Sequence, residues 1–306
     1  MTQWRLPVER FWLQEVSDAV CPGMYEVPNG FAIELHELDC TDSTNALLLE
    51  MARGGAPIGT VVWAHRQEGG RGRLGRSFSS PVGGIYISML VPCPKDPKDI
   101  GFTLTAKAGV AVKRAIRDVC GVECGIKWVN DIVVGGLKVC GILAQMVARE
   151  EGNVVVVGIG VNYSTPLSCF GEDLRGIVGS LYDADRVDAK DVPPMRSFVM
   201  SLVANLYGLV CGRECNVVGF TTCGTNSDTA SGGVANGKNC AKWLCEYKGS
   251  STILGNEVKI IQAGAVVGEG RAVLIDDDCH LHVLCDDGHE TVLSTGEVSV
   301  RKRGLK

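Results

Sequence analysis

The stretch Val154-Val155-Val156-Val157-Gly158-Ile159-Gly160-Val161 contains no charged or polar side chain. A continuous apolar run of this length is typical of a strand that is buried on both faces of a sheet. Just before it, residues 137–143 form another strand candidate, and Gly135-Gly136 can turn a hairpin between residues 132–134 and that strand. The chain is therefore predicted to build its core around a sheet that contains residues 154–161.

Strands and helices alternate on the N-terminal side of this central run. Further strands are predicted by short apolar or alternating runs at residues 31–38, 60–64, 85–90 and 126–128. The spacing of apolar residues predicts a helix that begins at Asp42 or Ser43 and another that ends near Gly121. A third amphipathic helix follows the central run, over residues 198–209. This order predicts a domain of mixed α and β structure.

The composition changes twice in the second half of the chain. Residues 221–239 are mostly Thr, Ser, Gly and Asn without apolar periodicity, which predicts a flexible surface insertion at about 221–240. From residue 253 on, short alternating runs separated by Gly, Asn and Asp predict a small β-barrel. We therefore expect three parts: an extension over 1–30 that docks through Trp4, Phe11 and Trp12, a main domain over 31–252, and a C-terminal domain over 253–306.

Composition and charge exclude several classes of protein. The 306 residues carry a net charge of −5, which argues against a general binder of nucleic acid or of membrane surfaces. No apolar stretch approaches the roughly 18 to 20 residues of a membrane span, and the first residues lack the pattern of a secretory signal. The 14 cysteines are expected to be reduced in a cytoplasmic protein, because the chain is long and shows no export signal.

Zinc binding is the alternative for three groups of cysteine and histidine. The structural zinc spacing Cys-x-x-Cys is absent from all three, and the third looks like a plain alternating strand. The three groups are Cys120/Cys124, Cys211/Cys215 and Cys279/His280/His282.

The run Gly70-Arg71-Gly72-Arg73-Leu74-Gly75-Arg76 carries the clearest chemical signal. Its three guanidinium groups suit phosphate and carboxylate oxygens, and its glycines let the backbone approach a ligand closely. Because the protein is acidic overall, this run forms a local positive island. Such an island suits a small anionic ligand better than a long polyanion.

Five other segments join this run in one pattern. They are Ser43-Thr44-Asn45, Gln67, the pair of segments Lys127-Trp128-Val129-Asn130-Asp131 and Lys138-Val139-Cys140-Gly141-Ile142-Leu143, and Gly158-Ile159-Gly160-Val161-Asn162. In order and spacing the combination closely resembles the biotin protein ligase family, from about residue 35 to residue 300. The resemblance implies an α+β fold with a class II synthetase-like, lipoate-ligase-like mixed sheet, followed by a small SH3-like β-barrel.

The resemblance also implies the reaction and the site. Biotin and ATP would form biotinyl-5′-AMP with Mg²⁺, and biotin would pass to a lysine of a carboxyl-carrier domain of a carboxylase. Catalytic roles are implied for Lys138, Arg71, Arg73 and Asp131, the last also as a candidate Mg²⁺ ligand. Biotin contacts are implied for Ser43, Thr44, Asn45, Gln67, Gly70, Arg71, Gly72, Arg73, Lys138, Gly141, Gly158 and Gly160. ATP contacts are implied for Arg71, Arg73, Arg76, Phe78, Asn130, Asp131, Lys138 and Asn162, with Phe78 where many members carry tryptophan.

Each of these residues also has an ordinary structural interpretation. Ser43 and Thr44 could serve only as a helix cap, Lys138 could be an exposed strand lysine, and Asn130-Asp131 could form a simple turn. Two other functions stay open: a lipoate or octanoate ligase or transferase on the related fold, and an RNA-binding or regulatory module. About thirty residues precede the pattern, too few for the DNA-binding domain of the family's repressor members. We therefore expect no repressor function and no nucleic-acid partner. We also expect a monomer or a weak dimer.

Overall fold

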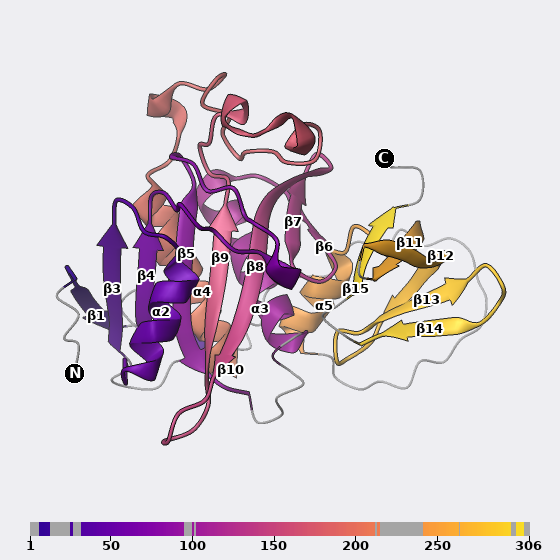
Figure 1. The fold of residues 1–306 in the computed structure, drawn as a ribbon, viewed down its shortest axis with the longest axis horizontal. Coiled ribbons are helices and arrows are strands. Elements are labelled where there is room, and N and C mark those ends of the chain that lie inside the picture. Colours follow the sequence, from indigo (N-terminus) through magenta and orange to yellow (C-terminus); the bar gives the residue numbers. More distant parts are fainter. Residues whose placement is uncertain are drawn as a thin grey trace.

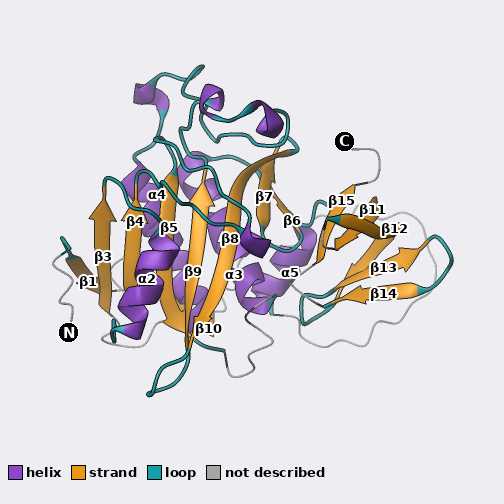
Figure 2. Cartoon of the chain, viewed as in Figure 1, coloured by secondary structure: helices purple, strands orange, loops and turns teal. Residues whose placement is uncertain are grey.

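The computed structural model describes residues 6–12, 25–26, 32–94, 100, 102–211, 213–214, 241–262, 264–294 and 298–302. The predicted insertion at about 221–240 lies outside the described residues, as does most of the predicted extension over 1–30, Trp4 included. Within them, the predicted fold class is confirmed: a large mixed sheet with helices is followed by a small antiparallel sheet (Figures 1 and 2).

The large sheet has eight strands in the order β1-β3-β4-β5-β9-β8-β7-β6. Only β3 and β4 are parallel, and every other neighbouring pair is antiparallel. The predicted central strand is β9, which pairs with β5 and β8 along its whole length. The strands are β1 Glu9–Trp12, β3 Ala32–Leu38, β4 Thr60–Ala64, β5 Ile85–Pro92, β6 Gly125–Lys127, β7 Asp131–Val134, β8 Leu137–Val147 and β9 Val154–Val161.

Helices cover both faces of this sheet. Helix α2 (Thr44–Arg53) covers one face, where Leu48 and Met51 pack with Val62 and Val156. The other face is covered by α3 (Thr103–Ala115), α4 (Met195–Cys211) and α5 (Lys242–Gly249) (Figure 1). This second layer holds the main hydrophobic core.

Helix α4 is more apolar than expected, because the sequence predicted no stretch long enough to span a membrane. By length and composition the segment Ala189–Cys211 could cross one, yet 61% of its most apolar window is buried inside the protein. Phe198, Leu202 and Leu206 of α4 are fully buried in the main core. The hydrophobicity of α4 is therefore explained by its place in the core.

The predicted helix ends agree with the structure at two residues. Ser43 is the N-cap of α2, and its side chain accepts a hydrogen bond from the backbone of Ala46. The turn Ile116–Cys120 extends α3 as a π-helix and ends at Gly121, whose φ of 64° suits glycine.

The C-terminal part is a five-stranded antiparallel sheet in the order β14-β13-β12-β11-β15. One face of the sheet is apolar and buried, with Val258, Ala272 and Val283 fully enclosed. The strands are β11 Glu257–Gln262, β12 Ala265–Ile275, β13 Leu281–Cys285, β14 Glu290–Leu293 and β15 Val298–Lys302. The remaining described strands, β2 (Tyr25–Glu26) and β10 (Arg213–Glu214), pair with each other.

Candidate functional site

The site begins with a row of glycines in the middle of the large sheet. Gly160 of β9 lies between Tyr86 of β5 and Gly141 of β8, and Gly158 lies between Ser88 and Leu143. A Cβ atom at Gly158 would stand 1.8 Å from Oδ1 of Asn45, and one at Gly160 would stand 2.4 Å from the ring of Phe78. The glycines are therefore required, because other side chains already rest on the sheet at these places.

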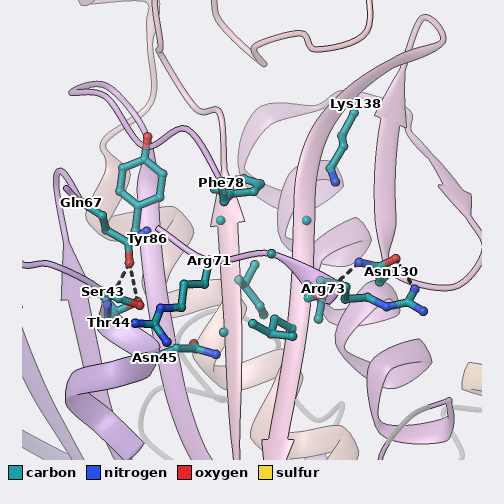
Figure 3. Close-up of a pocket in the computed structure, with 17 residues that line it drawn as sticks. Ser43, Thr44, Asn45, Gln67, Arg71, Arg73, Phe78, Tyr86, Asn130 and Lys138 are labelled. Carbon is teal, nitrogen blue, oxygen red and sulfur yellow. Dashed lines mark hydrogen bonds between the residues drawn. The ribbon is translucent and has the colours of Figure 1, made fainter. Parts of the chain in front are cut away.

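The beginning of α2 faces this row and carries the first polar group of the site. Gln67 Oε1 accepts hydrogen bonds from the backbone N–H of Thr44 at 2.9 Å and from the Thr44 hydroxyl at 3.1 Å. Ser43 and Thr44 are buried, with 2% and 3% of their surface exposed. Both residues therefore act as part of the helix start and also as pocket wall (Figure 3).

A second set of polar contacts lies beneath the first. The buried Ser88 hydroxyl lies 2.8 Å from the Thr44 hydroxyl and 2.6 Å from Oδ1 of Asn45. The amide nitrogen of Asn45 donates to Oε1 of Gln145 at 2.9 Å. Buried polar groups in such a network hold one another in fixed orientations. Ser88 and Gln145 were not predicted as site residues, because each is a single polar residue among the apolar residues of a strand.

The arginine loop, residues 70–76, crosses above the pocket. It is closed by backbone hydrogen bonds from Phe78 N to Gly70 O at 2.8 Å and from Gly72 N to Arg76 O at 2.7 Å. Gly75 has a φ of 72°, which suits glycine. The Arg71 side chain points toward Thr44 and Asn45, whereas that of Arg73 points toward Asn130 (Figure 3).

At the other end of the pocket, two basic side chains are each paired with a neighbouring side chain. Lys138 Nζ lies 2.6 Å from Oδ1 of Asp131, and Nη1 of Arg73 donates to Oδ1 of Asn130 at 2.9 Å. Asn130 is fixed in turn, since its amide nitrogen donates to the carbonyl of Ile142 at 3.0 Å. Burial lowers the pKa of Arg73, and the nearby Asp131 carboxylate opposes that shift. Lys138 and Arg73 therefore place two positive charges at this end of the pocket. Asp131 and Asn130 are the acceptors that hold them there.

Phe78 lies between the two ends of the pocket, over the paired glycines. Its ring would meet a Cβ atom at Gly141 at 3.0 Å, and Lys138 Nζ stands 5.9 Å from the ring centroid. Tyr86 meets the same ring edge-on at 6.5 Å, and burial raises the pKa of its hydroxyl. An aromatic ring therefore stands at this position, as the sequence predicted.

Most of the predicted site residues line one pocket, whose empty volume is about 470 Å³ including space open to solvent. They are Ser43, Thr44, Asn45, Gln67, Arg71, Gly72, Arg73, Phe78, Asn130, Lys138, Gly141, Gly158 and Gly160. Tyr86, Ile142, Leu143 and Ile159 also line it, and sequence analysis gave them no role in the site.

Four predicted residues do not line this pocket. Asp131 stays close through its ion pair with Lys138, and Gly70 lines an adjoining hollow that shares Gln67 and Phe78 with the pocket. Arg76 is exposed. Asn162 is buried, and its amide nitrogen donates to the carbonyl of Gly179 at 2.8 Å, while its Oδ1 has no hydrogen-bond partner among the described residues.

Metal-ligand clusters among the described residues lie in the C-terminal sheet. The two groups are Asp276/Asp278/His280 and Cys285/Asp287/His289. Cys120 and Cys124 belong to neither group, and Cys215 lies outside the described residues. The ten described cysteines are unpaired in the structure.

Two families match this chain. Residues 37–162 match the Biotin/lipoate A/B protein ligase family, and residues 253–301 match the Biotin protein ligase C terminal domain. The Bifunctional ligase/repressor BirA of Bacillus subtilis is 36% identical over 162 residues, which are 50% of this chain and 48% of that relative. The Biotin--[acetyl-CoA-carboxylase] ligase of Paracoccus denitrificans is 38% identical over 129 residues, which cover 40% of this chain and 51% of the relative. The chain thus spans about half the length of these curated relatives.

Solved structures show the same fold. The biotin protein ligase from Aquifex aeolicus in complex with biotin and ATP aligns with a TM-score of 0.62 at 24% identity, covering 88% of this chain and 98% of that one. A biotin protein ligase-like protein of unknown function from Silicibacter aligns with a TM-score of 0.58 at 12% identity, covering 88% of this chain and 96% of that one. At these identities the likeness shows the fold alone, so function has to be argued from the site.

Proposed function

We propose that the chain is an ATP-dependent biotin protein ligase, because residues 37–162 match the Biotin/lipoate A/B protein ligase family and residues 253–301 match the Biotin protein ligase C terminal domain. It activates biotin as biotinyl-5′-AMP and transfers it to a lysine of a carboxyl-carrier domain of a biotin-dependent carboxylase. We assign the catalytic unit to residues 31–252 and the C-terminal domain to residues 253–306.

The observation that carries this proposal is the two-ended chemistry of the pocket. One end offers donors and acceptors from Ser43, Thr44 and Gln67, and the Arg71 side chain points toward this end (Figure 3). The other end holds Lys138 and Arg73. Biotin has a matching shape, because a neutral ureido ring is joined by an apolar chain to a carboxylate. Leu143, which is paired with Gly158, supplies an apolar side chain on the pocket face of the sheet.

The first chemical step joins two anions. An oxygen of the biotin carboxylate attacks the α-phosphorus of ATP, the new O–P bond forms, and the bond from that phosphorus to the bridging oxygen breaks as pyrophosphate leaves. Lys138 and Arg73 stabilise the charge that collects in this transition state. Each of them is held by a side chain, Asp131 or Asn130, that can release it to a phosphate.

Mg²⁺ is expected to arrive with ATP and to neutralise its phosphate charge. The carboxylate of Asp131 and the amide oxygen of Asn130 are the hard oxygen donors that fit this ion. Both stand at the cationic end of the pocket, each in contact with a basic side chain.

The second step transfers biotin to the acceptor. The lysine amine attacks the carbonyl carbon of the mixed anhydride, a C–N bond forms, and the C–O bond breaks as AMP leaves. The amine must lose a proton, and Asp131 is the carboxylate we assign to orient the amine or take that proton. The adenine we assign to the face of Phe78 and to Asn162.

The decisive test is transfer of labelled biotin to a purified carboxyl-carrier domain in the presence of ATP and Mg²⁺. We expect incorporation that depends on ATP and that stops when the acceptor lysine is replaced by arginine. A parallel assay measures pyrophosphate release with biotin or lipoate as the only acid. Release with lipoate and not with biotin would overturn the proposal in favour of a lipoate ligase, which the matched family also contains.

A further inference from the structure

Ser80 lies at the neck of the arginine loop, where the chain entering the loop meets the chain leaving it. Its surface is only 6% exposed. The backbone N–H of Gln67 donates to the Ser80 carbonyl at 3.1 Å, and the backbone N–H of Phe78 donates to Gly70 O at 2.8 Å. The neck is therefore a short ladder of hydrogen bonds, with Gln67 at its start and Ser80 at its end.

The Ser80 hydroxyl joins the two sides of this neck. It accepts a hydrogen bond from Nε2 of Gln67 at 2.9 Å and donates to the carbonyl of Phe78 at 2.9 Å. The direction of the first bond is fixed, because the backbone N–H of Thr44 can only donate and so the oxygen of the Gln67 amide must face it. That orientation turns the Gln67 amide nitrogen toward Ser80.

The neck of the arginine loop is tightly packed around Gly70. A Cβ atom at Gly70 would stand 2.3 Å from the carbonyl oxygen of Phe78 and 2.5 Å from Oγ of Ser80. The backbone at Gly70 therefore packs directly against the Ser80 hydroxyl and the Phe78 carbonyl, and Gln67 Nε2 stands 3.1 Å from the same Cβ position. A small shift of Ser80 would therefore displace both Gly70 and the Phe78 carbonyl.

We propose that Ser80 is a positioning residue that ties the orientation of Gln67, at the neutral end of the pocket, to the position of Phe78 over Gly141 and Gly160. This inference rests on the proposed function, because it treats Gln67 as a biotin contact. Without the hydroxyl, the Gln67 amide nitrogen and the Phe78 carbonyl each lose a partner at a buried place. The Gln67 amide is then held through its oxygen by Thr44 and loses the partner of its nitrogen, and the neck of the arginine loop keeps its backbone hydrogen bonds but loses the side-chain link between its two sides.

Kinetics of the full-length protein test the link to Gln67. We expect Ser80→Ala to raise the KM for biotin about tenfold while kcat for pyrophosphate release stays within about threefold. Ser79→Ala is the matched control, because Ser79 is exposed and lies one residue away, and it should leave both constants within about twofold. Ser80→Thr keeps the hydroxyl and should restore most of the affinity.

A double variant separates positioning from general structural support. If Ser80 acts through Gln67, Ser80→Ala should change the biotin KM little once Gln67→Ala is present. Additive effects of the two substitutions would overturn the inference. So would a Ser80→Ala enzyme whose biotin KM stays within twofold of the Ser79→Ala control.

Limited proteolysis gives a readout that does not depend on the reaction. Trypsin can cut after Arg71, Arg73 and Arg76, and we expect the ligand-free Ser80→Ala protein to be cut there several-fold faster than Ser79→Ala. Equal cutting rates of the two variants would contradict the proposal that the Ser80 hydroxyl holds the two sides of the neck together. If the wild-type protein releases no pyrophosphate with biotin, the proposed function fails while this proteolysis result still decides the tie. If Ser80→Ala does not fold, Ser80→Cys serves the same assays, because a thiol forms weaker hydrogen bonds.

Discussion

Lys138 meets Asp131 at 2.6 Å, so its charge is balanced before any ligand arrives. Replacing it with alanine should nearly abolish adenylate formation, because a cation at the carboxylate–phosphate junction contributes roughly 3 to 4 kcal/mol to such a transition state. We expect pyrophosphate release to fall by about 10² to 10³, with little change in the melting temperature since the side chain is partly exposed. Stopped assays with ATP and biotin measure the first effect, and calorimetry measures the second.

A lysine of similar surface chemistry provides the control for that prediction. Lys190 also pairs with a carboxylate, that of Asp188 at 3.2 Å, but both side chains are about three-quarters exposed and lie outside the pocket. Lys190→Ala should leave pyrophosphate release unchanged. A Lys138→Ala enzyme that kept its rate within about tenfold of wild type would show that Lys138 is only a surface residue.

Arg73 differs from Lys138, since its guanidinium bonds to the amide of Asn130. Arg73→Gly should still make the adenylate but hold it poorly, because a charge-assisted contact of about 1.5 to 3 kcal/mol is lost and the loop gains flexibility. Escaped biotinyl-adenylate would acylate exposed amines of other proteins. The measurement is biotin incorporated into albumin added to the assay, compared with wild type. Labelling confined to the carrier domain would contradict the assignment.

At the level of single residues, the sequence was most informative where a motif crowds polar groups together. Ser43, Asn130 and Lys138 stand in such motifs, and the structure brings them to one pocket. Ser88 could not be found this way, because a lone serine among Ile, Tyr and Met in a strand looks like tolerated polarity. Only the pairing of β5 with β9 places its hydroxyl under Thr44. Cross-strand register of this kind depends on contacts distant in sequence.

Among the elements of the fold, the arginine loop carries the clearest prediction. Its exposed residues include Leu74, which is 51% exposed at a φ of 59°, so the free loop is held by few contacts. Biotinyl-adenylate should order it, because its phosphate brings the guanidinium groups together. Hydrogen exchange over residues 70–76 should slow at least several-fold with the ligand. Exchange that is equal in both states would rule out closure on the ligand.

Strand β13 carries a histidine whose charge stabilises the C-terminal sheet. Both ring nitrogens of His282 face carboxylates, those of Asp276 and Glu290, and the bond to Glu290 is the main cause that raises the pKa of His282 above 6.5. A raised pKa stabilises the fold below the unfolded value and ceases to do so as pH rises through the folded value. Asp276 has a lowered pKa, and its contribution is lost at acidic pH instead.

His282→Gln should therefore cost more stability at about pH 6 than at about pH 9. We expect a difference of at most about 1 kcal/mol, since the pair lies near the surface. Melting temperatures of the two proteins across this range measure it. A gap between wild type and variant that stays constant with pH would show that His282 contributes only packing.

The elements themselves could be predicted unevenly from the sequence. The β8–β9 pair and α4 have long apolar patterns, and the structure has them where the sequence placed them. Helix α5 was missed, because its eight residues make only about two turns and just two of them, Leu244 and Tyr247, are buried. A helix this short is stabilised by the residues it packs on, here α3, rather than by its own sequence.

At the scale of the whole molecule, the C-terminal part contacts the segment that carries Asn130 and Asp131. The indole N–H of Trp128 donates to the carbonyl of Cys279 at 2.9 Å, across the boundary between the two parts. Trp128 also stacks on Phe102, whose ring meets His280 edge-on. Because Asn130 and Asp131 lie only two and three residues after Trp128, the C-terminal part helps to fix the segment that holds Arg73 and Lys138.

Trp128→Phe should reveal this coupling, because it keeps an aromatic ring and removes the hydrogen bond to Cys279. A buried carbonyl left without its donor costs about 1 to 3 kcal/mol, so we expect a lower melting temperature. If the bond also positions Asn130 and Asp131, the KM for ATP should rise at least several-fold while the KM for biotin changes less. Trp243→Phe is the control, since Trp243 is half-buried on α5 and stacks under Lys107. Loss of stability in Trp128→Phe with an unchanged KM for ATP would mean that the two parts only pack together and that the C-terminal sheet does not shape the site.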